Sequence, residues 1–362
     1  MRTSLLILLM SVLYLFSGTP LEAACAGTSV SAFGAKGDGH TDDTAAIQSA
    51  ISAAASAGGG SVVFNVARYY TTGTFLVPAG VVLCGAIEGP FDVSGVDPAA
   101  TTIAPTLLVT NTGNPFLTLN GLGAGVTDLL FHYPNQVGVN ASAPNLYPYT
   151  LVVNFPGTKV VRSTVTNAYN FLDIESGRVL AQDLFIGAFN IGVNIDHAHD
   201  HVTLRNLLHT VYWDVVQNLS PPTPIDNWVM SYGIALVVNR ADGLEVHDFN
   251  VFFRSTGMLL EDSPDTTQNP RCGYGTGSDI DLDTMQNGII VTASNAQGYQ
   301  FTNLDVDTAG GQAVVQLKAG GSMPPDVLIN GGSEMGPWAL GAFPSPAAGH
   351  LSVVNIIGFN LP

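Results

Sequence analysis

Basic side chains are scarce in this sequence. Lys and Arg number 11 against 28 Asp and Glu, which gives the 362-residue chain a formal net charge of −17. Nucleic-acid binding depends on basic residues that neutralise phosphates, so this balance argues strongly against nucleic acid as a partner. It also argues, more weakly, against a polyanionic glycan that is held without a bridging cation.

Cysteine is scarce as well, since Cys25, Cys84 and Cys272 are the only three. Their spacing matches no metal-binding pattern, and they allow at most one disulfide, whose pairing the sequence does not reveal. Cys25 follows residues 21–24, which faintly resemble a lipoprotein cleavage box, although Glu22 fits that pattern badly. Lipidation of Cys25 is therefore the minor alternative to an ordinary signal peptide.

Long apolar runs are missing except at residues 5–16. That run is shorter than the ~20 residues that a transmembrane helix needs. Because Arg2 precedes it and Ala23 and Ala24 follow it, it predicts a secretory signal peptide over residues 1–24. We therefore expect a secreted protein, extracellular or periplasmic, with no membrane span and with a single domain over residues 25–362.

Short runs of alternating apolar and polar residues recur along the rest of the chain. Runs that begin at Val160, Val179 and Val202 follow one another at ~20 residues, a period typical of a β-solenoid. A β-sandwich would also have many short strands, but it would not explain the same pattern returning at this period. Longer gaps at residues 212–232 and 263–283 predict loops that wall one face of the solenoid.

Residues 30–51 predict a strand, a glycine-rich turn and the start of a helix over residues 41–57. The side chains expected to accept hydrogen bonds from the first helical N–H groups are Thr41, Asp42 and Asp43. The side chains expected on one apolar face of the helix are Ile47, Ala50, Ile51 and Ala54.

This segment closely resembles the opening signature of the pectate-lyase-like superfamily, in its rhamnogalacturonase/epimerase-like branch. The resemblance implies an all-β fold, a right-handed parallel β-helix with an N-terminal capping α-helix. The superfamily includes polysaccharide lyases, glycoside hydrolases, epimerase-like proteins and phage tailspikes, so the resemblance indicates architecture and not the reaction. The ordered signatures of polygalacturonase-type hydrolases are missing, and no catalytic residue is carried over from any subfamily.

Candidate catalytic residues come from the register of residues 171–175 over residues 192–196. Leu172, Ile174, Val193 and Ile195 are expected to point inward. The outward side chains would then be Asp173, Glu175, Asn194 and Asp196, and Glu261 joins their column if residues 257–261 align with them. Successive turns stack ~4.8 Å apart, so Glu175 and Asp196 would be neighbours. Residues 234–238 are aligned with residues 192–196 in the same way, which places Val238 next to Asp196 in the outward column.

Clustered carboxylates serve two kinds of chemistry. In a glycoside hydrolase one carboxylic acid and one carboxylate work as a pair, and mutual repulsion raises the pKa of one member. In many uronide lyases stacked carboxylates hold Ca²⁺ through hard oxygen ligands. The alternative to both is an ordinary solvated sheet face.

Three histidines alternate along the segment after Asp196, namely His197, His199 and His201, with His209 on the next strand. On an extended segment they would share one side and could bind a transition metal or move protons. The spacing matches no structural zinc pattern, so we expect no metal. A polar surface turn is the alternative.

The first long gap in the repeat contains aromatic residues that could stack on sugar rings. These residues are Tyr212, Trp213, Trp228 and Tyr232. Packing of the same side chains against the solenoid is the alternative. Cations are few, and Arg205 is the candidate to contact substrate. The alternative is that Arg178 and Arg205, on neighbouring strands, each form a structural ion pair with an acidic side chain.

The sequence therefore predicts a secreted enzyme that cleaves a polysaccharide, with a glycoside hydrolase favoured over a lyase. The expected catalytic residues are Asp173, Glu175, Asp196, His197 and His199, and the expected substrate-binding residues are Tyr212, Trp213, Trp228, Tyr232 and Arg205. No cofactor is expected, except Ca²⁺ in the alternative of a pectate-type lyase. A second alternative is a non-enzymatic β-helix that binds glycan, and the sequence leaves open whether the chain forms a homotrimer.

Overall fold

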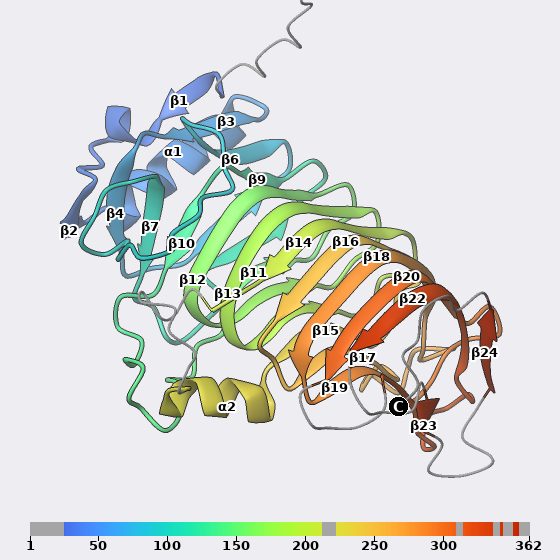
Figure 1. Cartoon of the computed structure of the whole chain (residues 1–362). Helices are drawn as coiled ribbons and strands as arrows, with labels where there is room; N and C mark the ends of the chain where they lie inside the picture. The colour runs from blue at the N-terminus through green and yellow to red at the C-terminus, as the bar shows by residue number, and fades with distance from the viewer. Residues whose placement is uncertain (1–24, 212–221, 309–313, 336–340, 343–349, 355–362) are drawn as a thin grey trace, which may run out of the picture.

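The computed structural model describes residues 25–211, 222–308, 314–335, 341–342 and 350–354, so the predicted signal peptide lies outside the described residues. The strands pair in parallel and stack into a right-handed β-helix (Figure 1). The fold class predicted from the sequence is confirmed.

The strand pairings fall into three columns, which we name sheets A, B and C in the order in which the chain visits them. Sheet A contains β1 (Gly27–Ser29), β3 (Gly60–Phe64), β6 (Val81–Gly85), β9 (Gly125–Thr127) and β24 (His350–Val354). Sheet B contains β2 (Asp38–Asp42), β4 (Ala67–Thr71), β7 (Pro105–Val109) and β10 (Leu130–His132). Sheet C contains β5 (Phe75–Pro78), β8 (Leu117–Asn120), β11 (Tyr149–Val153), β15 (Ile234–Val238), β17 (Thr256–Leu260), β19 (Asn287–Val291), β21 (Val315–Leu317) and β23 (Gly341–Ala342).

Longer strands bend from one sheet into the next. The strands that pass from sheet A into sheet B are β14 (Val202–His209), β16 (Asp242–Phe252), β18 (Tyr274–Met285), β20 (Tyr299–Thr308) and β22 (Asp326–Met335). Both β12 (Lys159–Ile174) and β13 (Val179–Ile195) run through all three sheets.

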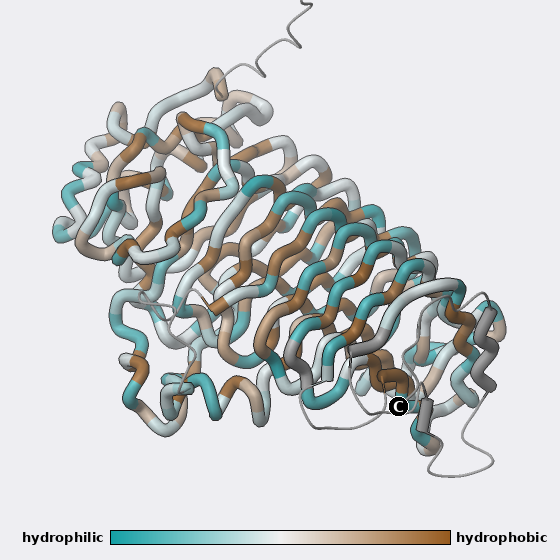
Figure 2. The backbone as a smooth tube through the Cα atoms, in the orientation of Figure 1, coloured by the Kyte–Doolittle hydropathy of each residue, from teal (hydrophilic) through white to brown (hydrophobic). Residues whose placement is uncertain are grey.

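The core consists of inward side chains that stack from turn to turn. On sheet C, Leu172 pairs with Val193 and Ile174 pairs with Ile195, and all four side chains are fully buried, as the sequence predicted. Figure 2 shows the alternation of hydrophobic and hydrophilic residues along these strands. Because side chains alternate across a strand, the polar residues between them face outward and supply the candidate site.

The corner between sheets A and B repeats one backbone conformation. The residues at this corner have positive φ, and most are Asp, Asn or Gly, which tolerate the left-handed region better than other residues. They are Asp128, Arg162, Asp183, Asn206, Asp248, Asp279, Asn303 and Gly331. At two of these corners an Asn amide donates to the Asp below it, from Asn206 to Asp183 and from Asn303 to Asp279, both at 2.7 Å.

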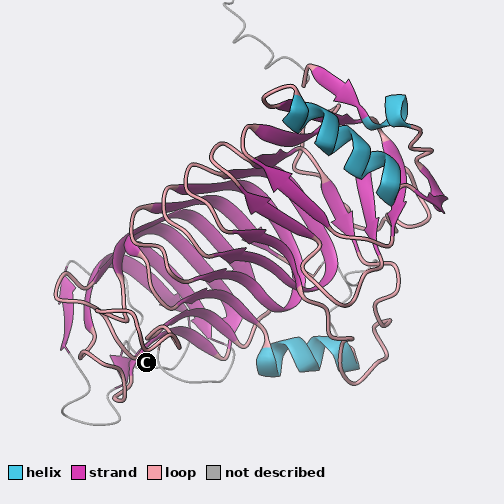
Figure 3. Ribbon diagram, turned by 180° about the vertical axis from the view of Figure 1, so that it is seen from behind, coloured by secondary structure: helices cyan, strands magenta, loops and turns pink. Residues whose placement is uncertain are grey.

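The helix α1 (Thr44–Ser56) follows the short 3-10 helix η1 (Val30–Phe33) and β2, at the N-terminal end of the solenoid (Figure 3). In this first turn α1 stands where later turns have a strand of sheet C. Its predicted apolar face is buried and continuous with the main core. The predicted bounds of 41–57 were slightly too wide.

Of the two acids before α1, Asp42 acts as predicted and Asp43 does not. Asp43 occupies the N-cap position but makes no side-chain cap, because its carboxylate accepts hydrogen bonds from the backbone N–H groups of Lys36 at 2.6 Å and Gly37 at 3.0 Å. Asp42 accepts from the backbone N–H and the hydroxyl of Thr44. Asp43 therefore fixes the glycine-rich turn, while Asp42 serves the start of the helix.

The first predicted insertion contains a helix, α2 (Pro224–Tyr232), along one side of the solenoid. A capping box between Thr223 and Asp226 begins it, with Pro224 in the first turn. The buried residues Ile225 and Val229 pack it against the corner between sheets B and C. The second insertion is shorter than predicted, because β18 already begins at Tyr274.

A disulfide joins Cys25 to Cys84 on β6, and Cys272 is a buried free cysteine. This settles the pairing that the sequence left open, and a Cys25 in a disulfide has no thiol to carry a lipid. None of the helices in the described part of the chain is long and apolar enough to span a bilayer.

The observed register differs in two places from what the repeat suggested. The runs that begin at Val160 and Val179 are offset by two residues, since Val160 pairs with Ala181. On sheet C, Ile195 pairs with Val238, so Asn239, not Val238, follows Asp196 in the outward column. Each error was one or two residues, because apolar alternation alone does not fix where a strand enters the stack.

Candidate active site

The predicted carboxylates lie where the strands of sheet C end and the chain turns toward sheet A. A ladder of backbone hydrogen bonds fixes this column. Each residue in it donates its N–H to a backbone carbonyl at the end of the sheet C strand in the preceding turn. The column contains Asn154, Glu175, Asp196, Asn239, Glu261, Thr292 and Lys318. Glu261 therefore belongs to the column as predicted, although Asp196 and Asn239 separate it from Glu175.

Asp173 is the acid of this site with the most perturbed ionisation. It pairs with Asn194 on the next strand, whose amide donates to Asp173 Oδ1 at 2.8 Å. Burial raises the pKa of Asp173 to about 7; the amide works against this, while the charge of Glu175 and a hydrogen bond with its side chain add to it. A carboxyl group with a pKa near neutrality can carry a proton that it donates in catalysis.

His197 connects the site to the loop after β17. Its Nδ1 lies 2.8 Å from Glu175 Oε2 and its Nε2 lies 3.0 Å from Asp265 Oδ2. The hydrogen bond with Asp265 raises the pKa of His197, and the charges of Asp196 and Glu175 add to this. Glu175, His197 and Asp265 each keep about a third of the side-chain surface exposed, so the group is open to solvent on one side.

Asp196 is not the accessible acid that the sequence predicted. Its side chain points away from the core, but the loop 261–273 covers it and only 4% of the residue is exposed. Its carboxylate accepts from Ser263 Oγ at 2.8 Å, Gln268 Nε2 at 3.0 Å and the backbone N–H of His197 at 2.7 Å. Asp196 therefore anchors the loop, and it could not contact a substrate without loop opening.

The histidines do not form one cluster. Because His197 has a φ of 51°, the segment is not extended there and the alternation rule does not apply. His199 is exposed, whereas His201 pairs with Asp200, 3.0 Å from Nδ1. His209 is fully buried in sheet B, with its ring edge-on to Phe249. The prediction of His199 as a catalytic neighbour of the acids finds no support in these contacts.

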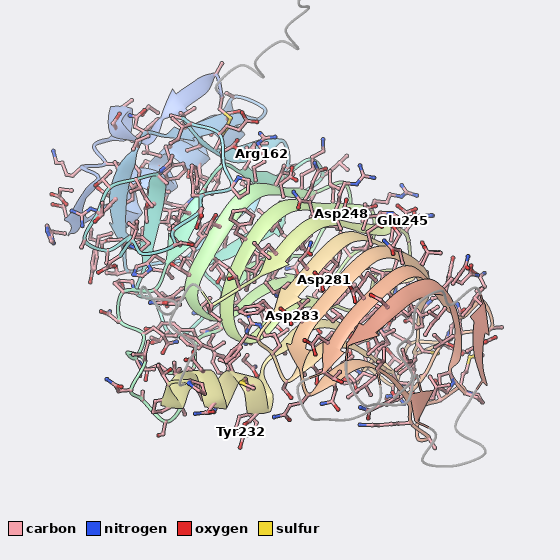
Figure 4. The ribbon with its side chains drawn as sticks, in the orientation of Figure 1. Arg162, Tyr232, Glu245, Asp248, Asp281 and Asp283 are labelled. Carbon is pink, nitrogen blue, oxygen red and sulfur yellow. A yellow bond between two sulfur atoms is a disulfide. The ribbon has the colours of Figure 1, made fainter. Side chains whose placement is uncertain are left out.

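The aromatic residues flank the opposite edge of sheet C. Trp228 and Tyr232 lie on α2 with ring centroids 5.1 Å apart, and Trp228 also lies 6.2 Å from Tyr169. Figure 4 shows Tyr232 on α2, where 60% of the residue is exposed. Tyr212 and Trp213, the other two predicted sugar-binding residues, lie outside the described residues.

The predicted cation lies elsewhere. Arg205 is exposed on β14 in sheet A, in register with Gln182 and His247, and it therefore does not face the carboxylates of sheet C. Arg178 forms a structural ion pair, as expected, with Asp200, whose Oδ2 lies 2.6 Å from its Nε. The structure thus separates Arg205 from the other candidate residues.

Sequence reasoning missed three residues of the site. Tyr149 is a partly buried phenol at the start of β11 whose pKa is raised, first by burial and then by the charges of Asp173 and Glu175. Asn239 donates to Asn194 Oδ1 at 3.1 Å. Asp265 comes from the inserted loop, and only its place in a long gap of the repeat could have indicated it.

A second acidic group lies on the outer face of sheet B, in the turns that follow the loop carrying Asp265. Asp281 on β18 pairs with Asp305 on β20, and Asp283 and Asp307 lie two residues further along the same strands. Figure 4 shows Asp281 and Asp283. The pKa of Asp281 is raised by burial and then by the charges of Asp305 and Asp283. The alternation of Asp with Ile, Leu and Val in these strands is visible in the sequence and could have indicated this group.

The carboxylates of sheet C do not fit a Ca²⁺ site. The oxygens of Asp196 already accept hydrogen bonds, and Glu175 accepts one from His197. In the described part of the chain, the group of metal-ligand side chains close enough to share an ion is Cys25, Cys84 and Asp128, and the disulfide uses both sulfurs. Hard-oxygen coordination by several carboxylates is therefore not prepared at this column.

One known protein family matches the N-terminal half of the chain. The family described as rhamnogalacturonase A/epimerase, pectate lyase-like, matches residues 27–211, just over half of the sequence. The chain belongs to this family. The matched region contains Asp173, Glu175, Asp196 and His197, but the match assigns no role to them.

Similar proteins cover the chain to very different extents. Alginate lyase 7 from Azotobacter vinelandii is 43% identical over 72 residues, which are 18% of this chain and 8% of that protein, so the chain spans only a small part of this relative. The Azotobacter vinelandii mannuronan C-5 epimerase AlgE4 A-module is 14% identical with a TM-score of 0.51, covering 92% of this chain and 96% of the module.

A phage protein has a similar fold. Tailspike protein 2 from the Escherichia coli O157:H7 bacteriophage CAB120 is 11% identical with a TM-score of 0.55, covering 91% of this chain and 42% of the tailspike. At these identities the likeness to solved structures shows the shared β-helix fold alone.

Proposed function

We propose that the protein is a secreted carbohydrate-active enzyme, a glycoside hydrolase that cleaves a neutral or weakly charged polysaccharide. The observation that carries the proposal is the pair formed by Asp173, whose pKa is raised to about 7, and Glu175, which accepts a hydrogen bond from His197. Asp173 would be the general acid, and Glu175 the carboxylate that acts as base or nucleophile.

The fold and the family support a polysaccharide as substrate. The family is described by rhamnogalacturonase A and epimerases, and the similar proteins include an alginate lyase and a mannuronan epimerase module. On this chain, the floor of sheet C offers amides and carboxylates, and α2 offers aromatic rings at its edge. Such a surface suits the hydroxyl groups and apolar faces of sugars.

Export is part of the proposal, and two observations support it. The N-terminal sequence has the pattern of a signal peptide. The Cys25–Cys84 disulfide is typical of proteins in oxidising compartments.

The alternative is a Ca²⁺-assisted lyase on an acidic glycan such as pectate. The family is described as pectate lyase-like, and a 72-residue segment of the chain is 43% identical to an alginate lyase. The occupied carboxylate oxygens of the sheet C column favour the hydrolase. Ultraviolet absorbance of an unsaturated uronide, abolished by a chelator, would select the lyase, because only elimination creates that double bond.

The second alternative is a non-enzymatic β-helix that binds glycan through Trp228 and Tyr232, a role that the exposure of Tyr232 suits. Measurable glycan binding without release of reducing ends or of unsaturated sugars from any polysaccharide would select it.

The test of the leading proposal is a reducing-sugar assay of the purified protein on a panel of polysaccharides, followed by variants on the substrate found. Glu175→Gln and Asp173→Asn should lower turnover by about 10²–10⁴-fold, the usual cost of losing an acid or base. Glu245→Gln, on β16 in sheet A, is the matched control and should keep wild-type turnover (Figure 4). Near-normal turnover of both site variants would contradict the assignment.

A further inference from the structure

Both ring nitrogens of His197 lie within hydrogen-bond distance of a carboxylate. Its Nδ1 is 2.8 Å from Glu175 Oε2, and its Nε2 is 3.0 Å from Asp265 Oδ2. Ionised carboxylates only accept hydrogen bonds, and a neutral imidazole has one N–H. The arrangement is therefore complete only when His197 is an imidazolium with a proton on each nitrogen.

Acidic groups face this imidazolium from three segments of the chain. Glu175 faces it from the turn after β12, Asp265 from the loop after β17, and Asp196 Oδ2 from its own turn, 3.6 Å from Nδ1. The nearby cations point elsewhere. Arg240 binds Asp242 and the carbonyl of Pro270, and Arg271 binds the carbonyl of Ser263.

Asp265 is oriented for this contact before His197 is considered. Its Oδ1 accepts from the backbone N–H of Thr267 at 2.8 Å and from the Thr267 hydroxyl at 2.7 Å, which leaves Oδ2 for the imidazolium. The base of the loop is held by the buried Asp196 through Ser263 and Gln268. The pKa of Asp265 is lowered to about 2, first by the hydrogen bond with His197.

We propose that His197 and Asp265 are positioning residues, which together fix the Glu175 carboxylate beside Asp173 for cleavage of the glycosidic bond. This inference rests on the proposed function. Asp265 holds the imidazolium, and the imidazolium holds Glu175, while neither His197 nor Asp265 transfers a proton to substrate. When His197 loses its proton, one of the two hydrogen bonds is lost and the orientation of Glu175 is no longer fixed.

The first test is an NMR titration of the histidine ring signals in the full chain, which needs no substrate. His197→Gln identifies the His197 signals. Asp265→Asn removes one facing charge, so the pKa of His197 should fall by about one pH unit. The matched control is Asp200→Asn, which removes the carboxylate that faces His201 and should leave His197 unchanged. An unchanged His197 in Asp265→Asn would overturn the proposal.

The second test is the pH profile of kcat/KM on the polysaccharide that the panel identifies. The wild type should lose activity as pH rises because both the general acid Asp173 and the imidazolium of His197 lose their protons. Asp265→Asn should move the His197 step, and with it the alkaline limb, to lower pH by the shift seen in the titration, with kcat lowered more than KM is changed. An unmoved limb despite a shifted titration would show that the contact only stabilises the loop. A wild type that cleaves no glycan would overturn the proposed function and the positioning role with it, while the titration would still report whether the contact exists.

Discussion

At the scale of single residues, the environment of each carboxylate decides what it can do. Asp173, Glu175 and Asp196 look equivalent in the sequence, yet they differ in the structure. Asp173 is partly buried beside an amide and a second acid, Glu175 binds a partly exposed imidazole, and Asp196 is covered by a loop that it anchors. Only the first two remain candidates for acid–base chemistry.

The raised pKa of Asp173 makes a prediction about stability. The Asp173 carboxyl binds its proton more tightly in the folded state than in the unfolded state, where its pKa is near the ordinary 3.8. The stabilisation of the folded state by this proton is therefore fully present below pH 3.8 and is lost as pH rises to about 7. Asp173→Asn removes this loss and keeps an acceptor for Asn194. The melting temperature of the variant relative to wild type should therefore increase from pH 4 to pH 8.

Thermal unfolding followed by circular dichroism at pH 4, 6 and 8 measures this difference. Glu88→Gln is the control, because the Glu88 side chain is 62% exposed and carries no comparable burial. A difference between Asp173→Asn and wild type that stays constant with pH would contradict the assigned environment of Asp173.

At the scale of elements, the solenoid depends on corners that repeat the same backbone conformation. Asn206 is an exposed corner residue with a φ of 52°. A β-branched residue is strained in this region, so Asn206→Val should lower the free energy of unfolding by about 1–2 kcal/mol. Asn206→Gly should cost clearly less, because glycine adopts positive φ freely.

Both variants lose the amide that donates to Asp183, so the difference between them isolates the backbone effect. Urea denaturation of the two variants and the wild type measures it. Equal stability of Asn206→Val and Asn206→Gly would show that the corner conformation is not under strain from the side chain.

At the scale of the whole molecule, the disulfide ties the first described residue to the third turn of sheet A. Cys25 and Cys84 are separated by 59 residues in the sequence. A disulfide that closes a loop of this size typically contributes about 2–4 kcal/mol. Reduction of the wild type, or replacement of both cysteines by Ser, should therefore lower the melting temperature.

The double variant Cys25→Ser/Cys84→Ser should not respond to reductant, whereas Cys272→Ser should respond as the wild type does. An unchanged melting temperature of the reduced wild type would contradict a stabilising role. The homotrimer that the sequence left open stays a prediction, which analytical ultracentrifugation of the purified protein can test.

The sequence by itself determined the architecture and part of the site. Alternating side chains and a repeat near one solenoid turn are local properties, so they predicted the β-helix, the buried Leu172 and Ile174, and the outward Asp173 and Glu175. The N-terminal signature likewise predicted α1, with an error of a few residues.

Only the tertiary structure decided which of the predicted residues meet. The loop 261–273 brings Asp265 to His197 and covers Asp196, and the turn at His197 sends His199 to solvent. Arg205 lies on sheet A, away from the acids of sheet C. These outcomes depend on where an inserted loop folds back and on the exact register of stacked turns, and neither is encoded in the local periodicity from which the strands were predicted.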